Sequence, residues 1–233
     1  MDFINFDYTF NDRKDTNVQD ILNKNVEKVS SLSSESSTNI HINLNITEVT
    51  KNLYLCSAMS VHSSTLQLLG VTCVINATLE LPDTPLPNDR VQYYRISVYD
   101  APNEDIKQHF STCSDLIQKV ACASGKTLLH CTAGVSRSAT LCIAYLMKYH
   151  NFTLLDAYNY LKLRRPIIKP NCGFFKQLID YEVELYDINT VKLVYNELLN
   201  LELPDVYDSD YKSLSYFRRK CKNSADQNIK QLS

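Results

Sequence analysis

The sequence predicts a three-layer α/β domain over about residues 44–186, with a mostly parallel central sheet flanked by helices. Two short apolar runs, VTCVINA at 71–77 and TLLH at 127–130, are typical of strands that are buried on both faces. Helical patterns of ten or more residues follow these strands along the chain. Because strands alternate with helices of this length, a parallel sheet covered on both faces is favoured.

Each element has a local signal, and these signals follow one another in chain order. The alternating stretch INLNITEVTKNLYLCS, broken at Lys51-Asn52, predicts a hairpin. A short helix over 61–69 is predicted to end at Gly70, and a strand over 92–98 follows the proline-rich loop LPDTPLPND. Apolar spacing, a Thr-x-x-Asp capping box and the prolines beyond it predict helices over 105–123, 137–149, 153–164 and 173–186.

The two ends of the chain have different compositions. Residues 1–43 are predicted to be a disordered tail, because the stretch VSSLSSESSTN is rich in serine and has few apolar side chains. Residues 187–233 are predicted to form a C-terminal extension with one helical stretch, partly packed on the domain. Its apolar residues are more concentrated than a free tail would carry: Val191, Leu193, Val194, Leu198, Leu199, Leu201 and Leu203.

Composition excludes several classes of function. The net charge is −2 and the pI is about 6.2, so nucleic acid is not an expected partner. No apolar run approaches the roughly 20 residues of a membrane span, and the N-terminus has no secretory signal pattern. We therefore expect a cytoplasmic or nuclear protein. The eight cysteines form no C-x-x-C pair and no cluster with zinc spacing, so no metal site is expected.

The chemistry is expected in the segment HCTAGVSRSA, residues 130–139, where a buried strand meets a buried helix. A loop at such a junction directs its backbone N–H groups into a cup, and the helix adds the positive end of its dipole. Such a cup binds a tetrahedral dianion. The residues expected to form it are Thr132, Ala133, Gly134, Val135, Ser136 and Arg137.

Each residue type in this segment has a physical role. Cys131 is the expected nucleophile, because loop amides, a helix N-terminus and a nearby guanidinium all favour its thiolate. The planar fork of Arg137 can hold two oxygens of a phosphoryl group, and Gly134 permits a tight turn. Ser138 can donate a hydrogen bond to the sulfur. His130 is expected to orient the cysteine through hydrogen bonds rather than proton transfer.

HCTAGVSRSA, with LCIAYLMKYH after it and AYNYLKLRRPIIKPNCGFFKQL further on, resembles the cysteine-dependent dual-specificity protein phosphatases of the protein tyrosine phosphatase superfamily. The resemblance covers about residues 44–186. The tail TVKLVYNELLNLELPDVY is similar to that of a small subgroup of atypical members. The resemblance implies a protein tyrosine phosphatase-like fold. It also implies hydrolysis of phosphotyrosine and of phosphoserine or phosphothreonine in proteins through a cysteinyl-phosphate, without a metal or another cofactor.

An attack by a thiolate needs an acid for the leaving oxygen, and the upstream candidates are Asp83, Asp89, Asp100 and Asp105. Asp100 is favoured because it follows a predicted strand, QYYRISV, and so lies at the carboxyl edge of the sheet, where the cup also lies. The family's spacing between acid and cysteine also matches VYDAPNED. Asp105 is expected to be a helix N-terminal charge.

Two features downstream allow alternative readings. Asn171, in KPNCGF, matches a family asparagine that braces the loops around the site, and it is equally a helix N-cap. Arg164, Arg165 and Lys169 either meet substrate phosphate or acidic side chains, or form a solvated helix end.

The resulting hypothesis is a monomeric protein phosphatase that acts on phosphoproteins, with protein kinases among the candidate substrates. One alternative is a phosphoinositide or RNA 5′-phosphatase of the same fold. Lipid-specific relatives tend to carry lysines in the loop, which here contains only uncharged residues before Arg137. The other alternative is a non-catalytic phosphoprotein-binding module.

Overall fold

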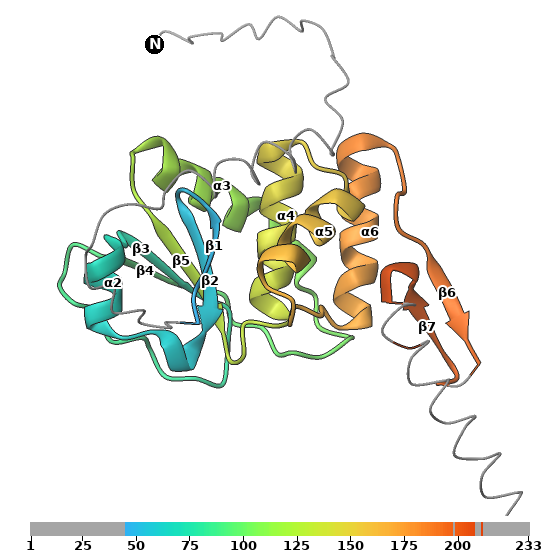
Figure 1. Cartoon of the computed structure of the whole chain (residues 1–233), viewed down its shortest axis with the longest axis horizontal. Helices are drawn as coiled ribbons and strands as arrows, with labels where there is room; N and C mark the ends of the chain where they lie inside the picture. Colours follow the sequence, from blue (N-terminus) through green and yellow to red (C-terminus); the bar gives the residue numbers. More distant parts are fainter. Residues whose placement is uncertain (1–44, 198, 208–210, 212–233) are drawn as a thin grey trace, which may run out of the picture. The chain divides into compact units, whose positions relative to one another are not determined.

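The computed structural model describes residues 45–197, 199–207 and 211, and a five-stranded sheet lies at its centre (Figure 1). The strand order is β1-β2-β5-β3-β4; β1 pairs with β2 antiparallel, and the other neighbours are parallel. The predicted fold class, a mostly parallel sheet flanked by helices, is confirmed. The strands are β1 (Thr47–Thr50), β2 (Leu53–Ser57), β3 (Cys73–Asn76), β4 (Gln92–Arg95) and β5 (Thr127–Cys131).

Helices cover both faces of this sheet. The helices are α2 (Ser63–Leu69), α3 (Phe110–Cys122), α4 (Arg137–His150), α5 (Leu154–Arg164) and α6 (Cys172–Tyr186). Alternate residues of β2 point to opposite faces, so Leu53 and Leu55 join the large core under α3 to α6, whereas Tyr54 and Cys56 join a smaller core under α2. In the described part of the chain, no helix is long and apolar enough to cross a membrane.

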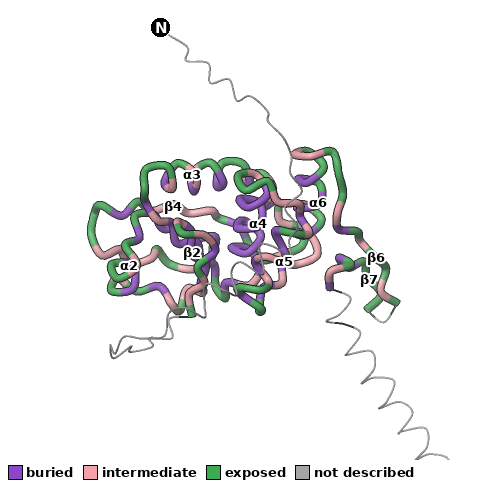
Figure 2. The backbone as a smooth tube through the Cα atoms, turned by 45° about the horizontal axis from the view of Figure 1, so that its top comes forward, coloured by how far each residue is buried: buried purple, intermediate pink, exposed green. Residues whose placement is uncertain are grey.

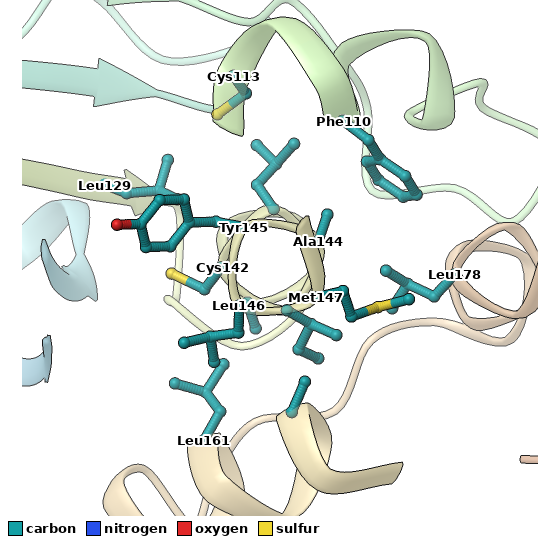
Figure 3. Packing of buried hydrophobic residues seen from close by; sticks show 14 of the residues in the cluster. Phe110, Cys113, Leu129, Cys142, Ala144, Tyr145, Leu146, Met147, Leu161 and Leu178 are labelled. Carbon is teal, nitrogen blue, oxygen red and sulfur yellow. The ribbon is translucent and has the colours of Figure 1, made fainter. Parts of the chain in front are cut away.

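Helix α4 lies at the centre of the large core (Figures 2 and 3). Its residues from Arg137 to Met147 are all buried, as expected for a helix that is apolar on nearly all sides. Side chains from α3, β5 and α6 surround it, among them Phe110, Leu129 and Leu178. The segment HCTAGVSRSA therefore continues into a helix that is buried along most of its length.

Most of the predicted local signals act as expected. Gly70 ends α2 with φ 66°, in the left-handed region, and the Thr153 hydroxyl caps α5 by accepting a hydrogen bond from the Asp156 N–H. The predicted hairpin is β1 and β2. The helix predicted over 105–123 begins later, because Lys107–His109 form a 3₁₀ turn before α3.

The described part of the chain beyond α6 contains a β-hairpin that the sequence did not predict. The helical stretch expected within residues 187–233 is not found in 187–197 or 199–207, and most of the chain after these lies outside the described residues. The antiparallel hairpin forms from β6 (Leu193–Asn196) and β7 (Leu201–Pro204), since β-branched, aromatic and leucine side chains flank a turn that contains Asn200 at φ 52°. Tyr207 after the hairpin is buried against the rings of Tyr158 and Phe175, and its hydroxyl donates to the Pro170 carbonyl at 2.6 Å. The predicted N-terminal tail, residues 1–43, lies outside the described residues.

Glu182 connects the start of this extension to the domain. Its side chain is 0% exposed and accepts three hydrogen bonds, from the Leu154 N–H at 2.7 Å, the Thr190 hydroxyl at 2.7 Å and the Thr190 N–H at 2.8 Å. One carboxylate on α6 thus satisfies the first N–H of α5 and holds the segment that leads to β6.

Replacement of Glu182 with alanine is expected to lower the free energy of unfolding by about 2–4 kcal/mol, because buried N–H and hydroxyl groups lose their acceptor. Glu184→Ala is the matched control, since this exposed carboxylate forms only a surface ion pair with Lys107. It is expected to cost under about 1 kcal/mol. Denaturant titration of both variants checks the difference; equal losses would contradict the role given to Glu182.

Candidate active site

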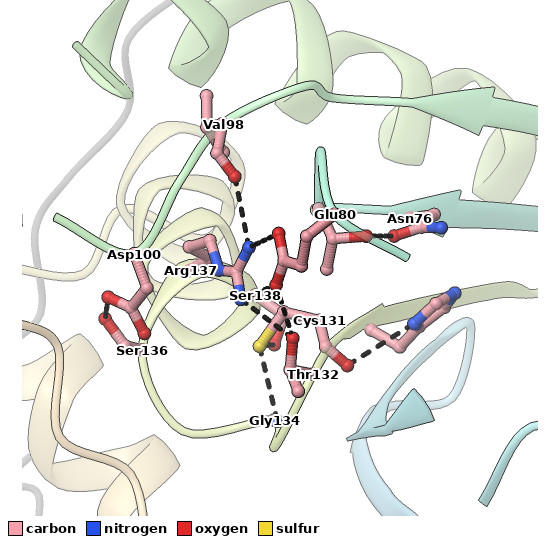
Figure 4. A network of polar contacts seen from close by, with 12 residues as sticks. Asn76, Glu80, Val98, Asp100, Cys131, Thr132, Gly134, Ser136, Arg137 and Ser138 are labelled. Atoms are coloured by element: carbon pink, nitrogen blue, oxygen red, sulfur yellow. Dashed lines mark hydrogen bonds and ion pairs between the residues drawn. The ribbon is translucent and has the colours of Figure 1, made fainter. Parts of the chain in front are cut away.

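Residues 132–136 form a loop between the last residue of β5 and the first residue of α4 (Figure 4). Cys131 ends the fully buried strand, and Arg137 begins the buried helix. The backbones of Cys131 and Arg137 are therefore held in place by the buried strand and the buried helix on the two sides of the loop.

The backbone carbonyls of this loop are all bonded away from its centre. Because a trans peptide points its N–H opposite to its C=O, the N–H groups of residues 133–137 are left facing inward. We call this set of N–H groups the cup, and its arrangement is suited to an anion. The Thr132 carbonyl accepts from the Ala58 N–H (3.2 Å), the Val135 carbonyl from the Lys169 N–H (2.9 Å) and the Ser136 carbonyl from the Thr140 N–H (2.8 Å). The carbonyls of Ala133 and Gly134 accept from the Arg165 guanidinium (3.2 and 2.8 Å).

Arg165 supports the loop from the outside. Its side chain is 3% exposed, and besides the two loop carbonyls its Nη1 donates to the Asn45 carbonyl and to the Thr47 hydroxyl. The reading in which Arg165 meets substrate or forms a solvated helix end is thus wrong, because the chain buries this guanidinium behind the cup. Sequence gave no signal for this role, since LRRP looks like any basic helix end.

Arg164 and Lys169 lie at aromatic rings. The Arg164 guanidinium lies 3.5 Å from the centre of the Tyr160 ring and donates to the Tyr160 carbonyl at 3.3 Å. The Lys169 Nζ lies 4.3 Å from the centre of the Tyr211 ring. These contacts favour the helix-end reading for Arg164 and place Lys169 beside the C-terminal segment.

Cys131 lies inside the cup. Its side chain is 2% exposed, and its Sγ accepts a hydrogen bond from the Ser138 hydroxyl at 3.0 Å and from the Gly134 N–H at 3.3 Å. Gly134 has φ 67°, and a Cβ at this position would lie 2.5 Å from the Cys56 carbonyl oxygen. Both the turn and the packing therefore require glycine.

Other cysteines of the domain are suited to the core rather than to catalysis. Burial raises the pKa of Cys56 and of Cys113 to about 12, and that of Cys73 to about 11. These groups are thiols at neutral pH, and a thiol is a poor nucleophile.

His130 contacts the backbone of the nucleophile rather than its sulfur. One ring nitrogen, Nδ1, lies 3.4 Å from the Cys131 carbonyl oxygen, and Nε2 lies 2.9 Å from the Thr84 hydroxyl. Burial lowers the pKa of His130 to about 4, so the ring is neutral at physiological pH. These contacts fit an orienting role, with no proton transfer to or from the sulfur.

Arg137 is held by several acceptors above the cup. Both of its terminal nitrogens donate to Glu80, each at 2.7 Å; Nη1 also donates to the Val98 carbonyl at 3.1 Å and Nη2 to the Thr132 hydroxyl at 2.9 Å. The Arg137 Nε is buried and has no hydrogen-bond partner among the described residues. A buried N–H beside the cup is suited to an oxygen of a bound anion.

Glu80 was not predicted from the sequence. The hydrogen bonds from Arg137 lower the pKa of Glu80 to about 2, so the carboxylate is charged at neutral pH. The Thr132 hydroxyl donates to Glu80 at 2.7 Å, which closes a three-residue network at the rim of the cup (Figure 4).

Asp100 lies on the exposed loop after β4, near the same end of the sheet. Its Oδ1 accepts hydrogen bonds from the Ser136 hydroxyl at 2.6 Å and from the Asn171 side-chain amide at 2.9 Å. Asn171 also caps α6, because its Oδ1 accepts from the Phe174 N–H at 3.0 Å. The two readings of Asn171 are therefore compatible. Asp105 accepts from the Gln108 N–H at the start of the next helical turn, as expected for a helix N-terminal charge.

The comparisons with known proteins agree with one another. The model of the dual specificity phosphatase catalytic domain matches residues 53–184. Mouse dual specificity protein phosphatase 14 is 48% identical over 171 residues, covering 72% of this chain and 84% of the relative. Human dual specificity protein phosphatase 18 is 42% identical over 168 residues, covering 72% of this chain and 87% of the relative.

A solved structure has the same fold. The crystal structure of human DUSP28 is 33% identical in sequence, and it superposes with a TM-score of 0.58 over 60% of this chain and 95% of that chain. The chain therefore belongs to the dual-specificity phosphatases of the protein tyrosine phosphatase superfamily.

Proposed function

We propose that Cys131, Arg137 and Asp100 divide the chemistry of this protein phosphatase among them as nucleophile, phosphoryl clamp and proton carrier. The family hydrolyses phosphotyrosine and phosphoserine or phosphothreonine in proteins, and so does this chain. One observation supports the assignment of residues. A hydrogen-bonded sulfur, a buried guanidinium N–H without a partner and an exposed, oriented carboxylate all border one cup.

In the first step, the Cys131 thiolate attacks phosphorus, the bond from phosphorus to the substrate oxygen breaks, and protonated Asp100 gives its proton to that oxygen. The hydrogen bonds from Ser136 and Asn171 both fall on Oδ1 of Asp100, so Oδ2 is left to carry the proton. The inward N–H groups and Arg137 stabilise the charge on the three other phosphoryl oxygens.

In the second step, the Asp100 carboxylate takes a proton from water, and the resulting hydroxide attacks the cysteinyl-phosphate. The S–P bond breaks, releasing phosphate and restoring the thiolate. Ser138 stabilises the departing sulfur through its hydrogen bond at 3.0 Å.

Asp100→Asn tests the assignment of the acid. An alkyl ester such as a phosphoserine peptide needs its leaving oxygen protonated, so its kcat is expected to fall by about 100-fold. An activated aryl phosphate has a better leaving group, and its kcat is expected to fall less than about tenfold. The matched control is Asp105→Asn, five residues away at a helix start. Equal losses on both esters, or a larger loss in the control, would contradict the assignment.

We further propose that phosphorylated protein kinases are among the substrates. Kinase activation loops carry phosphothreonine and phosphotyrosine, an alkyl and an aryl ester, and dual specificity covers both. The cup has no lysine, which argues against a phosphoinositide headgroup. Phosphate release from a doubly phosphorylated activation-loop peptide is therefore expected to be faster than from a phosphoinositide; the opposite order would contradict this choice.

We also propose a cytoplasmic or nuclear location for this protein. It is supported by the requirement that Cys131 stay reduced to act, which a reducing compartment meets.

A further inference from the structure

Four of the five guanidinium N–H groups of Arg137 have hydrogen-bond acceptors among the described residues, and the fifth has none. Glu80 takes one N–H from each terminal nitrogen, at 2.7 Å each, and therefore faces the end of the guanidinium. The Val98 carbonyl takes the outer N–H of Nη1, and the Thr132 hydroxyl takes the second N–H of Nη2. Only Nε has no partner among the described residues.

This arrangement divides the guanidinium into two edges. The end, with Nη1 and Nη2, is held by a charged carboxylate and a backbone carbonyl. The side, with Nε and the second N–H of Nη2, is open except for the hydroxyl of Thr132. A phosphoryl group that uses two parallel N–H···O bonds fits the side edge without displacing Glu80. It has only to replace a neutral hydroxyl of an exposed loop residue.

We propose that Glu80 is a positioning residue that fixes the guanidinium of Arg137 in the transition-state geometry, and that Thr132 is the exchangeable partner that phosphate displaces. Glu80 acts through Arg137 and does not touch the reacting atoms. Two parallel bonds fix both the position and the plane of the guanidinium, which a single bond would not do. The segment that carries Glu80 is thus part of the catalytic machinery, although it lies 57 residues from Arg137 in the sequence.

Glu80→Gln tests the role of the carboxylate. The amide keeps one acceptor, but its NH₂ group faces a guanidinium N–H, so one of the two bonds is lost. We expect kcat for p-nitrophenyl phosphate to fall by about tenfold or more, because a misplaced clamp loses transition-state contacts first. The Ki for orthovanadate, which resembles the five-coordinate transition state, is expected to rise by about tenfold, and the Ki for inorganic phosphate by less than about threefold.

Two further variants distinguish the geometry of the Glu80–Arg137 pair from the charge of Glu80 and from effects on folding. Glu80→Asp keeps the charge but is one carbon too short for the paired bonds, and it is expected to lower kcat and weaken vanadate binding in the same way. Asp83→Asn is the matched control, because this exposed carboxylate on the same segment pairs with Arg95 instead. It is expected to leave kcat and both Ki values near those of the wild type, with melting temperatures recorded for every variant.

Thr132→Val tests the exchangeable contact. Removal of the competing hydroxyl is expected to lower the Ki for inorganic phosphate by about two- to threefold. The proposal is overturned if Glu80→Gln and Glu80→Asp keep wild-type kcat, or if they raise the Ki of vanadate and of phosphate equally. A higher phosphate Ki in Thr132→Val would show that Thr132 is a permanent ligand and overturn the second half. If Glu80→Gln fails to fold, Glu80→Asp decides.

Discussion

Replacement of Cys131 with serine is expected to lower kcat by at least about 10⁴-fold, since a hydroxyl is a far weaker nucleophile than a thiolate. The fold of the cup should survive, because a serine oxygen can still accept the hydrogen bonds that Ser138 and the Gly134 N–H now give to the sulfur. Phosphate affinity should therefore stay within about threefold of the wild type, as binding rests on the loop N–H groups and Arg137.

The measurement is steady-state hydrolysis of a phosphotyrosine peptide, with phosphate affinity determined by calorimetry. Cys122→Ser is the control, because this exposed thiol near the end of α3 lies outside the cup. Residual activity of Cys131→Ser within about 100-fold of the wild type would mean that another group attacks phosphorus.

Replacement of Arg137 with lysine is expected to lower kcat/KM by about 10³-fold, even though the charge is kept. An ammonium group has no planar fork, so it cannot bond to Glu80 with two parallel N–H groups and present two more to a phosphoryl group. The structure uses four of the guanidinium N–H groups for the protein and leaves Nε without a partner among the described residues.

Arg95→Lys is the matched control for this substitution. Its half-buried guanidinium also forms an ion pair with a carboxylate, the exposed Asp83, and donates to the Thr78 carbonyl rather than to a residue of the cup. Its kcat/KM is expected to remain within about threefold of the wild type. A similar small loss in Arg137→Lys would contradict the bidentate role of Arg137.

The catalytic loop could be predicted from sequence because its signals are local. A continuous apolar strand, a glycine at the turn and a nearly all-apolar helix follow one another within residues 127–147, and each signal has one structural reading. The same holds for Gly70 at the end of α2 and for Thr153 at the start of α5. Where local chemistry determines the backbone, the prediction and the structure agree.

Glu80 and Arg165 could not be predicted because their roles depend on contacts distant in sequence. Glu80 is one of several acidic residues in a polar loop, and only the folded chain brings it to Arg137. Arg164 and Arg165 are adjacent arginines, yet the Arg165 guanidinium is buried behind the loop and the Arg164 guanidinium stacks on the Tyr160 ring. No residue pattern distinguishes the two. The hairpin at 193–204 was not predicted because Val194, Leu198 and Leu201 recur at spacings of four and three, which is typical of a helix.

The most direct test of the proposed chemistry is to detect the covalent intermediate. Wild-type protein is mixed with a phosphotyrosine peptide, quenched with denaturant within one turnover, digested and read by mass spectrometry. We predict a phosphoryl group on the sulfur of Cys131. With an activated aryl phosphate, which needs little acid for its release, the level of this intermediate is expected to rise in Asp100→Asn, because without the carboxylate no group takes the proton from the attacking water. Phosphate released within that turnover without any phosphorylated Cys131, or with the label on another residue, would contradict the account.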